Sequence, residues 1–235
     1  MSPGLIVFSL VLAAILVLVW RKMVAAQRAE FIRHFALPQG LYERLRKRRP
    51  ELSLKDCQLV SQALRQFFLA HLRSGRRFVS MPSQVADDLW HEFILYTKEY
   101  ESFCRKAFGR FLHHMPAVVL GSARDANAGL RRCWWHVCRE ENINPRQPTR
   151  LPLLFALDAK LKVADGFHYR PSCGSVRNRK SDDGSPIYCG TDFSSSDFDG
   201  GTDGFGDSGS ADGGGGDSGG GDSGGCGGGC GGGGD

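Results

Sequence analysis

An apolar run near the start of the chain constrains its fold more than any other feature. Residues 4–20 read GLIVFSLVLAAILVLVW and contain no charged side chain. As a helix with a rise of 1.5 Å per residue, the run spans about 25 Å, slightly less than a hydrocarbon core of about 30 Å. Trp20 suits the membrane interface, and the long side chains of Arg21 and Lys22 can extend to the headgroups. The run therefore predicts a membrane anchor over residues 1–22.

The charges on either side of this run favour an anchor over a cleaved signal peptide. A signal peptide has a basic segment before its apolar run and a small-residue cleavage site after it. Here Met1-Ser2-Pro3 carries no basic side chain, and Arg21-Lys22 follows the run. Because nine bases and two acids lie between residues 21 and 49, the positive-inside rule places the remainder of the chain in the cytoplasm. We therefore expect an uncleaved, single-pass membrane protein with a cytoplasmic C-terminal domain.

The same basic stretch also bears on the partners of the protein. Bases this close to a span attract anionic lipid headgroups, so membrane lipid is the first expected partner. Nucleic acid is a less favoured partner, because aromatic side chains for base stacking are scarce around residues 44–49. The sequence identifies no small-molecule substrate: it contains neither a P-loop nor a His-Glu-x-x-His motif.

Between residues 23 and 165 the apolar residues recur with a helical period, and no segment alternates as a strand does. Glycine and proline signals separate the expected helices. These helices cover residues 41–49, 53–74, 82–108, 124–140 and 153–163. The predicted fold class is all-α, with an N-terminal transmembrane helix, a helical domain of four to five helices over residues 23–165, and a disordered Gly-rich C-terminal tail.

The helix expected over residues 82–108 carries the most informative pattern. Its apolar and aromatic residues recur at intervals of three or four and form one face that we expect in the core. They are Val85, Leu89, Phe93, Tyr96, Tyr100, Phe103 and Ala107. The opposite side carries Asp88 and His91, which lie one turn apart and can reach each other. A buried acid and a buried imidazole must be paired, hydrogen-bonded or bound to metal.

Around this helix the chain resembles the glycine-rich domain proteins, a family best known from plants and with shorter relatives in bacteria. The resemblance covers about residues 50–120 and the style of the tail. Phe93 stands where the family has a second histidine. The resemblance implies a helical fold and a polar cluster, and it implies no particular reaction. The residues that carry it are Asp87 or Asp88, Trp90-His91, Tyr100, Cys104, Gly109, and His113 or His114.

These observations define a candidate polar cluster, which consists of Asp87, Asp88, His91, Cys104, His113 and His114. An acid and an imidazole together can bind zinc or support acid–base catalysis. The alternative, which the sequence leaves open, is an Asp–His pair that satisfies itself inside a helical bundle. A zinc or copper ion is the cofactor that these residue types favour. The candidate metal ligands are Asp88, His91, His113, Cys226 and Cys230.

The composition of the chain changes after the helical domain. We expect a polar linker over residues 166–189 and a disordered, acidic tail over residues 190–235. The tail holds 22 of the 31 glycines, and residues 181–235 carry a net charge of −11 against +16 for the residues before them. Such a segment has too few apolar side chains to offset the entropy of an ordered chain. Cys226 and Cys230 could chelate a soft or borderline metal, be modified, or form a disulfide.

Taken together, these features favour interaction or scaffolding at the membrane, with another protein as partner and with a link to a metal. Two alternatives stay open. One is a metal-dependent or acid–base enzyme that uses the Asp/His cluster on the helix over residues 82–108. The other is a basic domain that binds nucleic acid.

Overall fold

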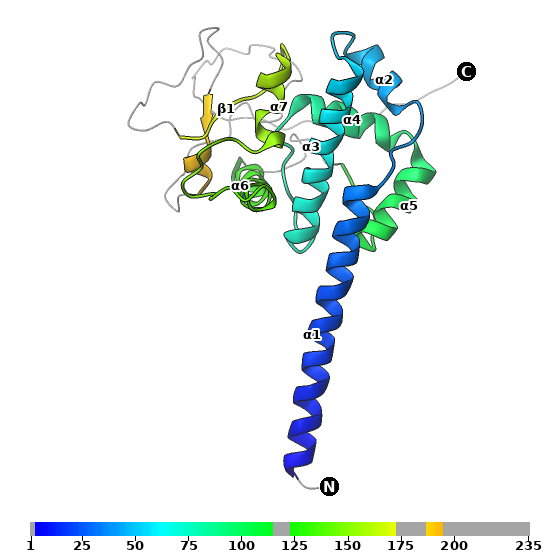
Figure 1. Ribbon diagram of the computed structural model, residues 1–235, viewed down its shortest axis with the longest axis vertical. Helices are drawn as coiled ribbons and strands as arrows, with labels where there is room; N and C mark the ends of the chain where they lie inside the picture. The colour runs from blue at the N-terminus through cyan, green and yellow to red at the C-terminus, as the bar shows by residue number, and fades with distance from the viewer. Residues whose placement is uncertain (1–2, 115–122, 173–186, 195–235) are drawn as a thin grey trace, which may run out of the picture.

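The computed structural model describes residues 3–114, 123–172 and 187–194 (Figure 1). In these residues the fold is mostly helical, as predicted, with seven helices and one pair of short strands. The helices are α1 (Pro3–His34), α2 (Leu41–Arg48), α3 (Leu54–Arg73), α4 (Gln84–Ile94), α5 (Thr97–Phe108), α6 (Ala123–Glu140) and α7 (Leu153–Leu161). The strands are β1 (His168–Arg170) and β2 (Ile187–Cys189), and a short 3-10 helix, η2 (Gly190–Ser194), follows β2.

Helix α1 projects from the domain over most of its length (Figure 1). Its last turns pack against the domain, where Ala29 and Ile32 are buried. In contrast, the large apolar side chains between Leu5 and Val19 are exposed. Among the described residues, α1 is therefore long and apolar enough to span a membrane. The same uninterrupted helix runs from the apolar segment into the core of the domain.

Helix α3 lies at the centre of the domain and packs against α1, α4, α6 and α7. Its first turn is held by a capping box, in which Ser53 and Asp56 each bond to the other's backbone N–H. Its aromatic side chains reach the neighbouring helices: the ring centroid of Phe68 lies 4.9 Å from that of Phe103 and 6.0 Å from that of Trp90. The core therefore joins α3 to α4 and α5, the two helices that carry most of the candidate polar cluster.

The prediction of a single helix over residues 82–108 is wrong. The chain leaves the helical conformation at Tyr96, which has φ −83° and ψ 64°, so that α4 and α5 are separate and six helices follow α1. Tyr96 is only partly buried, whereas the other six residues of the expected face are buried. The apolar period correctly predicted which side chains are buried, but it wrongly predicted one continuous helix. Spacings of three and four also fit two separate helices that face the same core.

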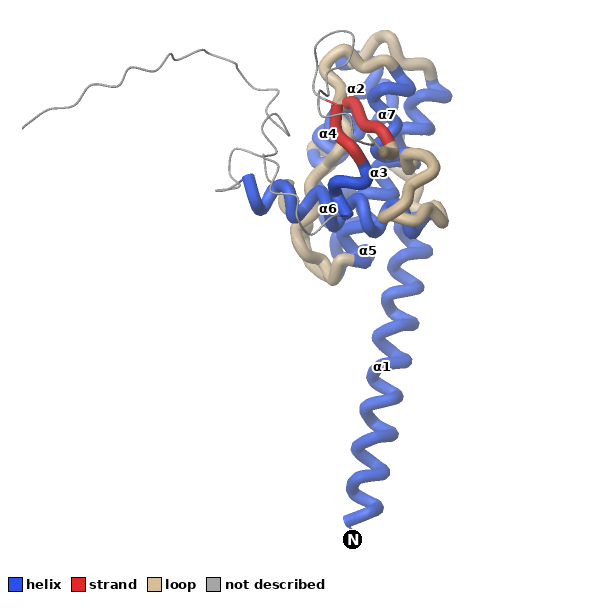
Figure 2. The backbone as a smooth tube through the Cα atoms, turned by 90° about the vertical axis from the view of Figure 1, so that its left-hand side faces the viewer, coloured by secondary structure: helices blue, strands red, loops and turns tan. Residues whose placement is uncertain are grey.

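The two strands pair in parallel, with His168 opposite Ile187 and Arg170 opposite Cys189 (Figure 2). The sequence did not predict this pairing, because each strand has only three residues and lies within a polar segment. Alternation over three residues is too short to be recognised as a strand.

Aromatic side chains fasten this strand pair and η2 to the helical core. Tyr169 and Phe193 are buried, and the ring centroid of Tyr169 lies 5.0 Å from that of Phe155, while that of Phe193 lies 5.7 Å from that of Trp134. Residues 168–170 and 187–194 therefore pack on the core, although the sequence suggested a linker and a tail there. Residues 173–186 and 195–235, with Cys226 and Cys230, lie outside the described residues.

Candidate metal centre

The first turn of α4 is held rigidly, and this turn carries Asp87. Ser83 caps the helix by accepting a hydrogen bond from the backbone N–H of Ala86. The buried carboxylate of Asp158, from α7, accepts hydrogen bonds from the Ser83 hydroxyl (2.6 Å) and the backbone N–H of Gln84 (2.8 Å). A carboxylate near a helix N-terminus is also favoured by the helix dipole. The position of Asp87 is therefore set by contacts between α4 and α7.

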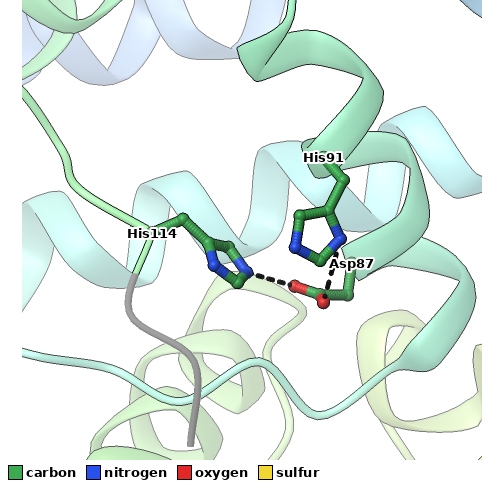
Figure 3. A group of neighbouring side chains, drawn as sticks. All are labelled: Asp87, His91 and His114. Atoms are coloured by element: carbon green, nitrogen blue, oxygen red, sulfur yellow. Dashed lines mark hydrogen bonds and ion pairs between the residues drawn. The ribbon is translucent and has the colours of Figure 1, made fainter. Parts of the chain in front are cut away.

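Three side chains of the candidate polar cluster meet at this turn (Figure 3). The Oδ1 atom of Asp87 lies 3.0 Å from Nε2 of His114, and its Oδ2 atom lies 3.4 Å from Nδ1 of His91. The two imidazole rings are 4.3 Å apart between centroids. One ligand atom from each residue lies within 4.8 Å of the other two. The carboxylate therefore lies between two imidazoles, and we call this group the Asp87 triad.

His91 leaves one of its nitrogens without a hydrogen bond. Its Nδ1 atom is buried and has no hydrogen-bond partner among the described residues, although the carboxylate of Asp87 lies 3.4 Å away. A buried polar atom without a partner is uncommon and needs an explanation. The side chain of His91 as a whole is 41% exposed, compared with 20% for Asp87 and 17% for His114. The Asp87 triad can therefore be reached from solvent past His91.

A chain of hydrogen bonds holds the loop that carries His114. The indole N–H of Trp90 donates to the hydroxyl of Tyr100 (3.1 Å), and that hydroxyl donates to the backbone carbonyl of Leu112 (2.6 Å). The thiol of Cys104 is also hydrogen-bonded to the backbone of Leu112. The ring of Trp90 contacts that of His114 directly, at 4.6 Å between centroids. Residues of α4 and α5 thus place His114 against Asp87.

Tyr100, Cys104 and Gly109 therefore support the site rather than form it. Burial raises the pKa of Cys104, so its thiol is held in the neutral form. Gly109 ends α5 with φ +76°, in the left-handed region that glycine adopts without strain. The turn at Gly109 starts the short loop that ends at His114. Cys104, a candidate member of the cluster, thus lies in the core beside the loop.

Asp88 points away from the Asp87 triad and is paired with arginines. Its Oδ2 atom lies 2.8 Å from Nε of Arg49, and its Oδ1 atom lies 3.0 Å from Nε of Arg48. Arg49 also binds Asp165 through both terminal nitrogens. Burial raises the pKa of Asp88, and the hydrogen bond from Arg49 opposes this effect. The expected pairing of Asp88 with His91 is thus replaced by an Asp87–His91 pair, because Arg48 at the end of α2 and Arg49, which follows it, both pair with Asp88.

The other candidate residues lie apart from the Asp87 triad. His113 is exposed, and its ring contacts that of Phe111 at 4.8 Å. Adjacent residues of an extended loop point in different directions, so only His114 of this pair faces Asp87. Cys226 and Cys230 lie outside the described residues. The sequence did not reveal the roles of Arg49 and Asp165, although a buried Asp88 required a cationic partner.

The Asp87 triad has the composition of a metal site with open positions. Zinc binds histidine nitrogen and carboxylate oxygen at about 2.0–2.2 Å, which places the ligand atoms of a tetrahedral site about 3.4 Å apart. The separations of 3.0 and 3.4 Å are close to this value, and they are made by the two different oxygens of Asp87, Oδ1 to His114 and Oδ2 to His91. Two histidines and one carboxylate are typical of sites that keep a position for water or substrate. The residue types, and the placement of one ligand atom from each within 4.8 Å of the others, therefore suit a divalent transition metal.

Comparison with known proteins corrects the family assignment. The chain matches the family described as UCP032817-like over residues 27–193. The assignment to the glycine-rich domain proteins is therefore wrong: a few shared residues, spread over two helices and a loop, do not define a family. No curated protein and no solved structure matches the chain. The matched region begins in the domain-packed part of α1 and ends at Phe193, a buried residue of η2. Because this region covers most of the 235 residues, the protein belongs to the UCP032817-like family.

Proposed function

We propose that this protein is a single-pass membrane protein whose helical domain binds a divalent transition metal, such as zinc, through Asp87, His91 and His114. The observation that carries the proposal is the placement of one carboxylate between two imidazoles, one of which has a buried nitrogen without a hydrogen bond. The bound ion would retain an open position on the solvent side of His91. An ion held in this way can recruit a ligand side chain from a partner protein, which is the interaction role that we favour.

An enzymatic role is the second candidate. The exposure of His91 and the Asp87–His114 pair favour it, because a carboxylate that orients an imidazole is a common arrangement in general acid–base catalysis. A bound metal would add an activated water at the open position. The two roles share the same three residues, so the first question is whether metal binds at all.

Metal content and stability of the full chain in detergent test the proposal. Each variant carries Cys226→Ser and Cys230→Ser, so that thiols of the tail do not contribute. We expect one zinc ion per chain in this background, and we expect Asp87→Asn, His91→Gln and His114→Gln each to lose it while they remain folded. His113→Gln is the matched control and should retain the ion, since His113 lies beside His114 but faces away from Asp87.

Two results would overturn the metal proposal. One is a wild-type triad that takes up no zinc, cobalt or copper. The other is zinc that is retained by all three triad variants. If no metal binds and the triad variants unfold at lower temperature, the Asp87 triad is a structural contact between α4 and the loop that follows α5.

For the anchor, we propose that residues 4–20 of α1 span the membrane and that the domain is cytoplasmic. The exposed apolar side chains of α1 need an apolar environment, and the bases that follow them favour the cytoplasmic side. One observation favours the other side: Cys189 is disulfide-bonded, and disulfides are rare in the cytosol. Two reporters fused to the C-terminus decide between the orientations: one is active only in the cytoplasm and the other only on the opposite side of the membrane. A mature N-terminus beyond residue 20 would instead identify a cleaved signal sequence.

A further inference from the structure

The end of the domain from which α1 emerges carries a group of basic side chains, which are exposed except for the partly buried Arg28. The C-terminal ends of α3 and α5 lie at this end of the domain (Figure 1). The carbonyl oxygen of Phe108, the last residue of α5, accepts hydrogen bonds from Arg28 of α1 (3.1 Å) and from Arg76, which follows α3 (2.9 Å). These contacts hold α1, the segment that follows α3 and the end of α5 together at this end of the domain. We call the group the basic collar; it consists of Arg28, Arg76, Arg77, Arg105, Lys106 and Arg110.

The basic collar lies near the level at which the apolar part of α1 ends. Lys22 follows the apolar run, and Arg28 lies six residues further along the same uninterrupted helix. At 1.5 Å per residue, the rise between them is about 9 Å. Long basic side chains shorten the remaining gap. Because the attraction of an anionic surface persists over about 8 Å at physiological ionic strength, the basic collar lies within its range.

The positive charges of the basic collar are largely available to an external anion. Arg28, Arg76 and Arg110 donate hydrogen bonds to backbone carbonyls. A carbonyl is neutral, so these contacts do not neutralise the positive charges. Arg105 lies 3.8 Å from Glu101, in an exposed pair that contributes little. Bases at helix C-termini also interact with the helix dipole, but a dipole end amounts to only about half a charge. A net positive group therefore lies at the end of the domain from which α1 projects.

We propose that the basic collar binds the anionic headgroups of the bilayer that holds α1, so that the helical domain rests against the membrane. The proposal depends on the anchor described under the proposed function and is independent of the metal. Each base that reaches an anionic surface strengthens the attachment roughly fivefold. The charge of the basic collar, its height above the span and its place at the α1 end of the domain all fit a lipid surface.

Hydrogen exchange of the full chain in nanodiscs tests this proposal. The discs contain either phosphatidylcholine alone or phosphatidylcholine with phosphatidylserine. We expect the backbone amides of residues 73–77 and 105–110 to exchange roughly fivefold or more slowly in the anionic discs than in the neutral ones. High salt should remove the difference, because the attraction is electrostatic.

Two charge-reversal variants make the test specific. The collar variant carries Arg77→Glu, Arg105→Glu and Lys106→Glu and should lose the protection. The control variant carries Lys47→Glu, Lys55→Glu and Lys160→Glu, three exposed lysines on α2, α3 and α7, and should keep it. Both variants change the net charge equally. Entry of all proteins into neutral discs checks the anchor separately; a chain that enters no disc overturns the anchor and this proposal together.

Three results would overturn the lipid proposal while the anchor holds. The first is equal exchange of the wild type in the two kinds of disc. The second is loss of protection in the control variant as well as in the collar variant. The third is protection of residues 73–77 and 105–110 by added RNA in neutral discs, without any effect of phosphatidylserine; this result would assign the basic collar to nucleic acid instead.

Discussion

The Oδ1 atom of Asp87 lies 3.0 Å from Nε2 of His114, a residue 27 positions further along the chain. This contact joins the first turn of α4 to the loop that follows α5. The loop is held in turn by hydrogen bonds between α5 and the backbone of Leu112. The metal site that we propose therefore depends on how α4 and α5 pack, and several substitutions can separate packing from metal binding.

The hydroxyl of Tyr100 should matter for both stability and metal binding. In Tyr100→Phe, the indole N–H of Trp90 and the carbonyl of Leu112 lose a buried partner, so we expect a loss of about 1–3 kcal/mol in the free energy of unfolding. We also expect zinc affinity to fall by 10-fold or more, as is typical when the support of a ligand is removed, roughly 10–100-fold. Chemical unfolding and zinc titration measure the two effects.

Tyr96→Phe is the control for this substitution. Its hydroxyl donates to the carbonyl of Gln39 in an exposed contact, so the loss should stay below about 1 kcal/mol, with unchanged zinc affinity. Equal effects of the two substitutions on zinc would show that Tyr100 does not position His114.

Replacement of Asp88 should mainly reduce stability, whereas replacement of its neighbour Asp87 should mainly reduce metal binding. Asp88 is 1% exposed and paired with Arg49, so Asp88→Asn removes a buried charge and leaves the partly buried Arg49 with only Asp165; it should cost about 3 kcal/mol in unfolding free energy. Asp87→Asn affects a partly exposed pair and should cost about 1 kcal/mol or less, but it should abolish metal binding. Unfolding curves and metal content of both variants check this, and a larger loss of stability in Asp87→Asn would contradict it.

Two carboxylates bond to the start of a helix, Asp158 to that of α4 and Asp56 to that of α3, and Asp158 should contribute more to stability. It is 2% exposed and binds the Ser83 hydroxyl and backbone N–H groups of Gln84 and Phe167. Asp158→Asn should therefore lower the unfolding free energy by about 2–3 kcal/mol, because hydrogen bonds to a charged group are lost and buried donors remain.

Asp56→Asn provides the comparison for Asp158→Asn, since Asp56 lies in the exposed capping box of α3. We expect it to cost about 1 kcal/mol or less. Thermal melting of the two variants side by side would settle the order. The reverse order would mean that α7 does not hold the start of α4.

His71 should make the stability of the domain depend on pH. The pKa of His71 is lowered to about 4, chiefly by burial and also by the nearby charges of Arg110 and Arg76, whereas the hydrogen bond to the carbonyl of Arg77 opposes this shift. In the unfolded chain the pKa is about 6.5. Between these values the unfolded chain binds a proton that the folded chain does not, so stability is complete above about pH 6.5 and falls toward pH 4 by up to about 3 kcal/mol.

Replacement of His71 by a side chain that does not titrate should remove this pH dependence. His71→Gln keeps a hydrogen-bond donor for the carbonyl of Arg77. We expect its urea midpoint to change less than that of the wild type between pH 7 and pH 4.5. Parallel profiles for the two proteins would show that other groups dominate the acid sensitivity.

The sequence by itself determined the features that depend on neighbouring residues along the chain. The apolar run predicted a spanning helix, and α1 is long and apolar enough to be one. Ser53 and Gly109 were at the ends of expected helices and do cap them. Such features follow from local properties: the transfer of side chains from water, the helical period and the conformations open to serine and glycine.

Only the tertiary structure decided which polar groups meet. Asp87 and Asp88 differ by 100° around α4, so the packing of α2 and of the loop after α5 determined that Asp88 binds Arg49 and Asp87 binds His114. The choice between His113 and His114 had the same origin. The helical period places a side chain on a face of its own helix, but it carries no information on what a distant segment brings to that face.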